Sequence, residues 1–286
     1  MNPISSSDNP KLRWLRRLAE SRGRRRTAEQ IAERMGRVLG GDQELLLLEG
    51  PHLVAAALGA DLDILQVFAS SDASTAVAAL QARLDAVENP PQRFEVTDGL
   101  LHGAVEAETS QGICALAILT HRPLPTADDL DGRVLAVWLD QLRDPGNVGA
   151  VLRVAEAAGV RIAGVSKASA SWRHPRALRA SAGSALRLHL RTDLDFDSFC
   201  DEVDQGLAHR LRWVGLDAQG GPLLRTDENG LVGIALGSES HGLSPDVVRR
   251  CDTLCAIEMA APVESLNVAV AAGIALYSLR GDRHCA

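Results

Sequence analysis

The sequence contains no run of about 18 consecutive apolar residues, the length that a membrane-spanning helix needs. Its start, from Met1 to Ser5, also lacks the apolar segment of a secretory signal peptide. Internal repeats and low-complexity tracts are missing as well. From these absences we expect a protein that is neither inserted in a membrane nor exported, and that works in the cytoplasm.

The cysteines form no metal-binding pattern. There are five in the chain, an odd number, and they are scattered. Cys251 and Cys255 stand close together, but neither a second cysteine pair nor a histidine cluster accompanies them. Structural zinc sites draw their ligands from such pairs. We therefore expect a reduced cytoplasmic protein without a bound metal.

Basic residues are concentrated in two parts of a chain whose net charge is −7. Residues 1–40 contain ten Lys/Arg and four Asp/Glu, and residues 143–191 contain nine and two. Affinity for phosphate depends on local basic surface, whereas net charge mainly affects solubility. Either segment alone could be a solvated basic helix, but two of them favour an RNA partner. The candidate RNA-binding residues are Lys11, Arg13, Arg16, Arg17, Arg24, Arg25 and Arg26.

Hydrophobic periodicity predicts two α/β domains after a basic N-terminal extension. The expected boundaries are 1–42 for the helical extension, 43–120 for a first α/β domain that binds RNA, 121–131 for a linker and 132–286 for a second α/β domain. Short apolar strands alternate with helices in both domains, which is typical of layered α/β folds.

The second domain is expected to contain a parallel sheet covered by helices on both faces, because its strands are short and continuously apolar. The expected strands are 134–139, 162–165, 187–190, 212–216, 232–236 and 254–257. The expected helices are 148–158, 174–182, 196–208, 245–250 and 266–280.

Three polar segments follow predicted strands, at junctions where free backbone N–H groups can meet a ligand. They are Asn147-Val148-Gly149-Ala150-Val151-Leu152-Arg153, Gly237-Ser238-Glu239-Ser240-His241-Gly242-Leu243-Ser244 and Glu264-Ser265-Leu266-Asn267-Val268-Ala269-Val270-Ala271-Ala272.

Each segment also has a purely structural interpretation. Asn147 and Ser265 are good helix caps, and Asn267 lies in the first turn of its expected helix, where it can cap or bind a ligand. Glu239 is more suggestive, because it follows the end of a strand, where open α/β sheets bind ligands. Arg153 lies in an otherwise apolar helix and needs an anionic partner, either Glu156 or a substrate phosphate.

Taken together, the three segments resemble the three motifs of the SpoU/TrmH family of the SPOUT RNA methyltransferases. The resemblance covers approximately residues 130–280. Four further segments resemble parts of the family, three of them a ribosomal-protein-like RNA-binding domain: Asp8-Asn9-Pro10-Lys11-Leu12, Leu48-Glu49-Gly50, Thr109-Ser110-Gln111-Gly112 and Arg179-Ala180-Ser181-Ala182-Gly183-Ser184.

The resemblance implies more than periodicity does. It implies a catalytic domain whose C-terminal part forms a trefoil knot, a homodimer with the active site at its interface, and transfer of a methyl group from S-adenosylmethionine to a ribose 2′-hydroxyl of RNA, with ribosomal RNA favoured. It implies catalytic roles for Arg153, Asn147, Glu239, Ser265 and Asn267. It places the cofactor at Leu216, Gly237, Ile257, Met259 and Leu266.

The residue matching the family's catalytic position is Arg153. Because a guanidinium has a pKa above about 12, we expect it to anchor a phosphate and stabilise the developing alkoxide rather than remove a proton. Asn147 is expected to orient Arg153 or the ribose.

One segment departs from the family pattern. Similar proteins usually read Ile-Pro-Met-x-Gly before the third motif, and this chain has Ile257-Glu258-Met259-Ala260-Ala261. Two alternatives therefore stay open: a non-catalytic RNA-binding or ribosome-assembly factor on the same fold, and a methyltransferase that acts on transfer RNA. A small-molecule enzyme is hard to reconcile with the basic N-terminus.

Overall fold

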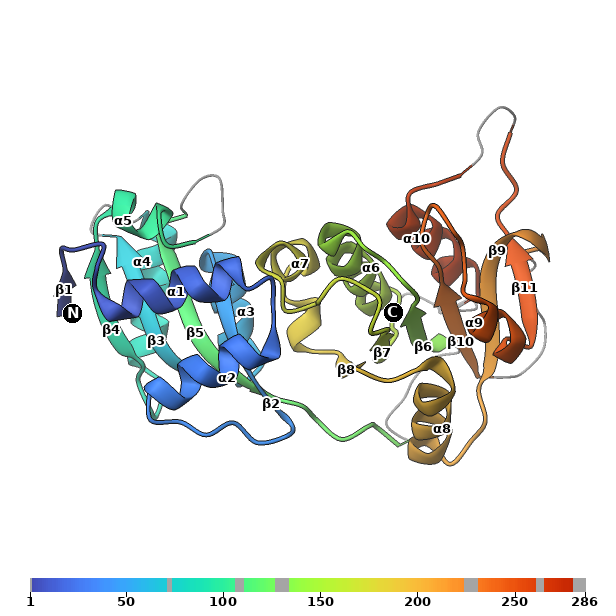
Figure 1. Cartoon of the computed structure of the whole chain (residues 1–286), viewed down its shortest axis with the longest axis horizontal. Helices are drawn as coiled ribbons and strands as arrows, with labels where there is room; N and C mark the ends of the chain where they lie inside the picture. The colour runs from blue at the N-terminus through green and yellow to red at the C-terminus, as the bar shows by residue number, and fades with distance from the viewer. Residues whose placement is uncertain are drawn as a thin grey trace. The chain divides into compact units, whose positions relative to one another are not determined.

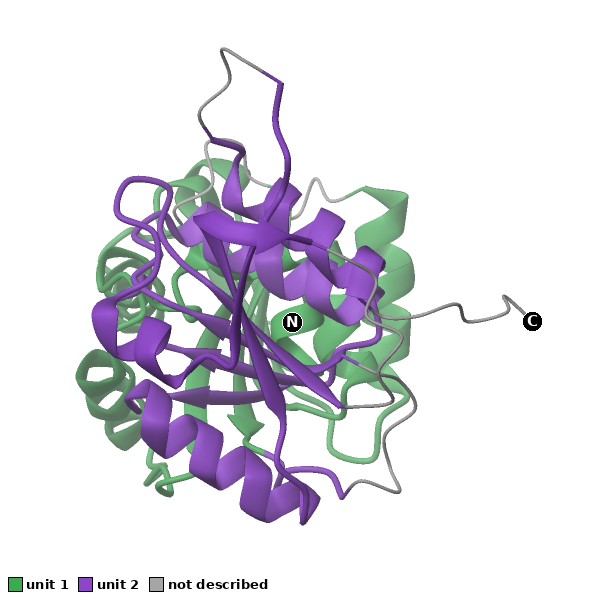
Figure 2. Ribbon diagram, turned by 90° about the vertical axis from the view of Figure 1, so that its right-hand side faces the viewer, with its two compact units in different colours: residues 1–121, 171–187 green, residues 122–170, 188–286 purple. Residues whose placement is uncertain are grey.

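A computed structural model describes residues 2–70, 74–105, 111–126, 134–223, 231–260 and 265–279. The chain divides into two compact units (Figure 2). The first comprises residues 1–121 and 171–187, and the second comprises residues 122–170 and 188–286. In the described part of the chain, no helix is long and apolar enough to cross a membrane.

The first unit is built on a mixed sheet, which has five strands in its described part, in the order β1-β4-β3-β5-β2 (Figure 1). These strands are β1 (Asn2–Ile4), β2 (Gln43–Glu49), β3 (Asp63–Ser70), β4 (Gln92–Val96) and β5 (Ile113–Thr120). The helices of the first unit are α1 (Pro10–Glu20), α2 (Arg25–Arg34), α3 (Pro51–Gly59), α4 (Thr75–Asp85), α5 (Asp98–His102) and α7 (Pro175–Ser181), followed by the short 3₁₀ helix η2 (Ser184–Leu186).

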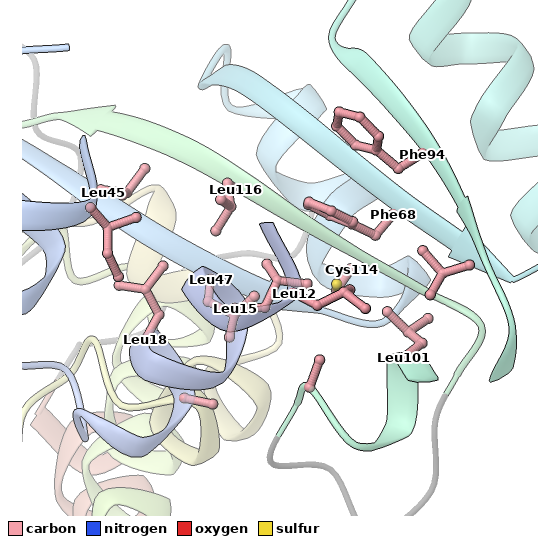
Figure 3. Close-up of a cluster of buried hydrophobic side chains, with 14 of the residues drawn as sticks. Leu12, Leu15, Leu18, Leu45, Leu47, Phe68, Phe94, Leu101, Cys114 and Leu116 are labelled. Atoms are coloured by element: carbon pink, nitrogen blue, oxygen red, sulfur yellow. The ribbon is translucent and has the colours of Figure 1, made fainter. Parts of the chain in front are cut away.

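The two basic helices are part of the core of the first unit. On α1, Leu12, Leu15 and Leu18 are buried and pack with strand residues such as Leu45 and Phe68 (Figure 3). The spacing of these leucines puts them on one helical face and leaves the arginines on the other. The expectation of a separate extension over residues 1–42 therefore differs from the structure, in which these helices complete a hydrophobic core.

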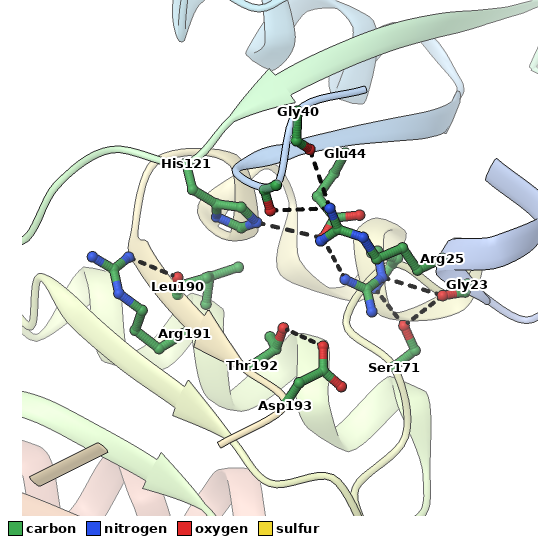
Figure 4. A network of polar contacts seen from close by, with 12 residues as sticks. Gly23, Arg25, Gly40, Glu44, His121, Ser171, Leu190, Arg191, Thr192 and Asp193 are labelled. Atoms are coloured by element: carbon green, nitrogen blue, oxygen red, sulfur yellow. Dashed lines mark hydrogen bonds and ion pairs between the residues drawn. The ribbon is translucent and has the colours of Figure 1, made fainter. Parts of the chain in front are cut away.

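A buried carboxylate holds the basic segments of the first unit together. Glu44 is 1% exposed and accepts hydrogen bonds from Arg25 at 3.1 Å and Arg173 at 2.6 Å. Figure 4 shows Arg25 and His121 converging on it. Burial alone would raise the pKa of Glu44, but the hydrogen bond from His121 and the charges of Arg173 and Arg25 hold it below its ordinary value.

Residues 171–187 were expected in the second domain, and the structure packs them with the first unit. Besides Arg173 on Glu44, Arg179 donates to the buried carboxylate of Glu49. Buried carboxylates need such partners, because an unpaired buried charge is costly. These ion pairs join residues far apart in sequence, and local periodicity carries no signal for them.

The second unit contains a parallel sheet, with six strands among its described residues, in the order β11-β9-β10-β6-β7-β8. These strands are β6 (Val134–Leu139), β7 (Ile162–Val165), β8 (His189–Thr192), β9 (Arg212–Pro222), β10 (Val232–Leu236) and β11 (Thr253–Ala256). The helices of the second unit are α6 (Pro145–Ala157), α8 (Phe196–Leu207), α9 (Pro245–Arg250) and α10 (Val268–Leu279). The expected parallel sheet is confirmed.

An aromatic cluster anchors α8 to this sheet. The Phe199 ring lies 5.1 Å from Trp138 on β6 and 5.8 Å from Trp213 on β9, measured between centroids. Phe196 meets Trp213 edge to face at 4.9 Å. On the opposite face α10 packs against α6, where a Cβ added at Gly273 would lie 3.6 Å from Val154. The sheet is therefore held between helices, and the ends of its strands have fixed positions.

Candidate active site

A pocket of about 330 Å³ lies where β9, β10 and β11 end. All five residues expected at the cofactor site line it: Leu216, Gly237, Ile257, Met259 and Leu266. Leu216 on β9 is paired with Leu236, the last residue of β10, and Ile257 follows β11. The carboxyl ends of neighbouring parallel strands meet at one edge of the sheet, which is where such sheets bind ligands.

The loop after β10 forms one wall of the pocket and depends on two glycines. Ser238 and Gly242 exchange backbone hydrogen bonds of 3.1 and 2.9 Å. Gly242 has a φ of +65°, a conformation that favours glycine. A Cβ at Gly237 would lie only 2.2 Å from the carbonyl carbon and oxygen of Gly242, so a side chain there would collide with backbone. The loop therefore folds back tightly on its own start.

The opposite wall comes from a part of β9 that sequence reasoning missed. The strand was expected to end at residue 216, but it continues to Pro222. Between Gly215 and Gly221 the pairing with β11 shifts register, and Asp217, Ala218 and Gln219 line the pocket. The segment Asp217-Ala218-Gln219-Gly220-Gly221 gave no strand signal, because it is polar and glycine-rich and lacks an apolar run.

Asn147, Glu239 and Asn267, one residue from each polar segment, form a hydrogen-bonded trio. The Asn147 amide nitrogen donates to the Glu239 carboxylate, and its amide oxygen accepts from Asn267 at 3.0 Å. Asn267 in turn accepts from the backbone N–H of Ala269 at 3.0 Å. Both polar atoms of Asn147 are thus used within the trio, which fixes its orientation.

Two helix starts differ from the expected ones. Helix α6 begins at Pro145, and its cap is Asp144, which accepts from the Asn147 N–H at 3.0 Å; Asn147 was expected to be this cap. Helix α10 begins at Val268, so the capping side chain is Asn267 rather than the expected Ser265. Ser265 is exposed and lines the pocket. Asn147 and Ser265 therefore do not cap these helices, and their side chains are not confined to a capping role.

Asp140 is a buried carboxylate that stabilises the site by hydrogen bonding, a role that the sequence did not reveal. This carboxylate is 4% exposed and accepts from the Ser244 N–H at 2.7 Å. It follows β6, and its own N–H donates to the Leu236 carbonyl at 2.8 Å. Asp140 therefore ties the start of α9 to the strand ends that carry the pocket. Its only sequence signal was its position directly after a buried strand.

Arg153 lies apart from the trio. It is exposed on α6, does not line the pocket, and forms no hydrogen bond or ion pair with any described residue. Asn147 was expected to orient Arg153 or the ribose; it is bonded to Glu239 and Asn267 and not to Arg153, and its role toward the ribose stays a prediction. The guanidinium is therefore available to a molecule outside this chain.

Several residues of interest lie outside the described residues. They are Thr109, Ser110, the linker residues 127–131, Ala261, Pro262, Glu264 and Cys285. Glu258, the other departure from the family pattern, is described; it is exposed and does not line the pocket. In the described part of the chain, no group of His, Cys, Asp or Glu side chains is placed to hold a metal ion.

The candidate RNA-binding residues differ in how freely they can act. Arg25 donates to the Glu29 and Glu44 carboxylates and to two backbone carbonyls. Its guanidinium group is therefore already hydrogen-bonded within the first unit. Arg16 and Arg17 donate to Gly103 and Gln30. Lys11 lies over the Trp14 and Phe94 rings. The exposed residues without such contacts are Arg13, Arg24 and Arg26.

With this geometry in place, comparison with known proteins settles the family. Residues 134–277 match the SpoU rRNA Methylase family. The chain belongs to this family. Its matched segment contains all three polar motifs and the whole described pocket.

Individual relatives agree with this membership. The chain is 31% identical to a 23S rRNA (guanosine-2′-O-)-methyltransferase of Ralstonia nicotianae, over 81% of this chain and 93% of the relative. It is 36% identical to an uncharacterized tRNA/rRNA methyltransferase of Mycobacterium sp. (strain KMS), over 56% of this chain, and it spans about half the length of that relative (50%).

Among solved structures, the SpoU methyltransferase AviRb from Streptomyces viridochromogenes, in complex with AdoMet, has the same fold. The TM-score is 0.77, with 22% sequence identity, over 94% of this chain and 96% of that chain.

Proposed function

We propose that this protein transfers a methyl group from S-adenosylmethionine to a ribose 2′-hydroxyl of ribosomal RNA. The observation that carries the proposal is the trio of Asn147, Glu239 and Asn267 beside a pocket at the strand ends. Membership of the SpoU family supports it, as does the name of the Ralstonia relative, which is a 23S rRNA 2′-O-methyltransferase. The trefoil knot implied by the resemblance is part of the same proposal.

The pocket fits the cofactor in size and composition. Ligand pockets in proteins span about 300–1,000 Å³ and combine apolar walls with a few polar groups. Here Leu216 and Leu266 provide apolar surface, and Gly237 leaves its backbone open to close approach. Leu216, Gly237, Ile257, Met259 and Leu266 hold the cofactor in this proposal. S-adenosylmethionine, when bound, supplies a methyl group on a positively charged sulfur.

Each residue of the site has a distinct role in the proposed reaction. Positioning of the ribose next to the methyl donor provides much of the acceleration, of order 7–11 kcal/mol for well-aligned groups. The trio and Ser265 surround the ribose with hydrogen-bonding groups of fixed orientation. Arg153 binds phosphate and stabilises negative charge on the 2′ oxygen as its proton passes to solvent water. A guanidinium cannot itself accept that proton, because its pKa is too high.

Because Arg153 does not line the pocket of its own chain, the proposal includes a homodimer in which it serves the pocket of the partner. Helix α10, which packs on α6, supports this. Val270, Ile274 and Tyr277 on α10 are 52%, 40% and 45% exposed. Their spacing places them on one helical face, and contiguous exposed apolar surface marks interaction sites. Ile274→Glu should give a monomer by analytical ultracentrifugation, whereas Val38→Glu, at an apolar residue 92% exposed in the first unit, should leave the dimer intact.

The experiment that tests the function combines cofactor binding with mapping of the product. Calorimetry should detect S-adenosylmethionine at micromolar concentrations, and ribosomal RNA from cells lacking the gene should lose one 2′-O-methyl group. Asn147→Ala should abolish methylation while the cofactor still binds. No heat of binding at millimolar cofactor would favour the non-catalytic alternative. If the 2′-O-methyl group is missing from transfer RNA instead, the proposed reaction stands and transfer RNA becomes its substrate. A cytoplasmic location completes the proposal, and the four described cysteines, all unpaired, agree with it.

A further inference from the structure

A second cavity lies in the first unit, far along the chain from the pocket described above. It measures about 410 Å³, and its walls come from α1, the end of α2, β3 and the segment leading into β4. Its lining includes Lys11, Trp14, Arg34, Arg37, Gln66 and Gln92. With Asn89 and Asp63, which also line it, this cavity combines three cations, one carboxylate, an indole ring and three side-chain amides.

The aromatic and basic groups of the cavity are adjacent. The Lys11 ammonium lies 5.3 Å from the centre of the Trp14 ring and 5.0 Å from that of Phe94. An anionic group bound by Lys11 would therefore lie next to the Trp14 ring. Arg34 is exposed, and Arg37 is held only loosely by Asp63 at 3.7 Å, with both side chains about half exposed. Cations beside an aromatic ring are the elements with which proteins bind single-stranded nucleic acids.

A buried amide gives the cavity a second and independent feature. Gln66 is 5% exposed, and its nitrogen donates to Gln92 at 3.2 Å. Its oxygen accepts no hydrogen bond from any described residue. A buried acceptor without a partner costs about 1–3 kcal/mol, and this oxygen has almost no exposed surface, so a ligand donor can reach it only when the amide turns toward the cavity that Gln66 lines. The exocyclic amine of a nucleobase is a donor of this kind.

We propose that this cavity binds one unpaired nucleotide of the RNA substrate. The phosphate lies at Lys11 and Arg34, the base stacks on Trp14, and the Gln66–Gln92 pair hydrogen-bonds its edge. RNA is read mainly at unpaired bases that stack on aromatic side chains, because the grooves of its helix hide the base edges. The inference rests on the proposed RNA substrate, and it adds a recognition site in the first unit to the proposed reaction site in the second.

The other tryptophans make this site directly observable. Trp138, Trp172 and Trp213 are at most 1% exposed, so Trp14 is the tryptophan that a ligand can reach. A stacked base quenches indole fluorescence. The test is therefore a titration of the full-length protein, without cofactor, with an unlabelled single-stranded adenosine oligonucleotide about ten nucleotides long. We expect saturable quenching, and none with inorganic tripolyphosphate, which has no base.

Three variants separate the parts of the site. Trp14→Leu should remove the quenching and weaken binding, measured by anisotropy of the labelled oligonucleotide, by about tenfold or more, since each stacked base contributes strongly. Gln66→Leu should weaken binding; it also removes the 3.2 Å hydrogen bond to Gln92, so the melting temperature is measured in parallel and should fall only slightly, because one partner of that bond is exposed. Arg34→Gln should make the salt dependence shallower by about 0.7 in log–log slope. Arg83→Gln removes an equal charge from an exposed position on α4 and is the matched control. It should leave the affinity for the oligonucleotide and its salt dependence unchanged.

Two outcomes would overturn the inference. If the oligonucleotide binds with unchanged affinity to Trp14→Leu, or binds wild type without quenching, the cavity is not a nucleotide site. Methylation of ribosomal RNA could still occur in that case, so the proposed function would stand. The converse result is quenching by the oligonucleotide in a protein that shows no heat of binding with S-adenosylmethionine. It would support the nucleotide site and contradict the proposed methyltransferase activity.

Discussion

Replacing Gly237 with alanine should disable the cofactor pocket while leaving the fold intact. The added Cβ would lie 2.2 Å from the carbonyl carbon and oxygen of Gly242 and 2.4 Å from the nitrogen of Leu243. All three neighbours are backbone atoms, so the loop between Gly237 and Leu243 must move as a whole. Forcing a methyl group into a packed site costs about 1–3 kcal/mol. The Ser238–Gly242 pairing is local, so we expect this cost to appear mainly as movement of the pocket wall.

The expected result is a loss of affinity for S-adenosylmethionine of about 5- to 150-fold, which corresponds to that energy range. Isothermal titration calorimetry measures the affinity, and thermal unfolding measures stability in parallel. Gly221→Ala is the matched control, because a Cβ there has only one neighbour, the Leu254 carbonyl at 4.0 Å. Wild-type affinity in Gly237→Ala would refute the placement of the cofactor against this loop. A large drop in melting temperature would instead show that the loop supports the fold.

Three further outcomes follow from the contacts of the structure. Glu44→Gln should destabilise the first unit by about 3 kcal/mol, because it removes the buried charge that faces Arg173. Since the folded pKa of Glu44 lies below its ordinary 4.5, this difference should be fully present above that pH and should shrink as urea unfolding is repeated at lower pH. Arg153→Lys should lower the single-turnover methylation rate by about 10²-fold with cofactor affinity unchanged, since an ammonium lacks the planar fork; a near wild-type rate would make Arg153 structural. Phe199→Ala should cost about 3–5 kcal/mol in urea unfolding, because its fully buried ring packs on Trp138.

Local patterns in the sequence predicted the second unit well. The strands 134–139, 162–165 and 232–236 begin and end at the expected residues, as does the helix 245–250. The three strands are short, uniformly apolar runs, and Ser244-Pro245 marks the start of the helix, so the signal lies within the segment or directly beside it. The expected cofactor residues came from the family resemblance and not from these local patterns; they line a pocket at the strand ends, where parallel sheets bind ligands.

Long-range contacts explain what the sequence did not predict. The short strand Asn2–Ile4 pairs with β4, some ninety residues later, and three residues give too little periodicity to detect. Basic helices that looked like an RNA-binding extension also bury Leu12, Leu15 and Ile31. Deleting residues 1–42 would therefore expose a hydrophobic core, and substitution of Arg13, Arg24 and Arg26 is the better test of RNA affinity.

The position of residues 171–187 has a consequence for how the chain is made. Arg173 and Arg179 neutralise Glu44 and Glu49, the buried carboxylates at the two ends of β2. When residue 121 has been synthesised, the sheet of the first unit is present but these cations are not. At about 5–20 residues per second, another 3–13 seconds or so of translation pass before residue 187 is added. During this interval the nascent first unit has Arg25 and His121 beside Glu44 but lacks Arg173 and Arg179, so it completes these ion pairs only after residues 122–170 of the second unit have been synthesised.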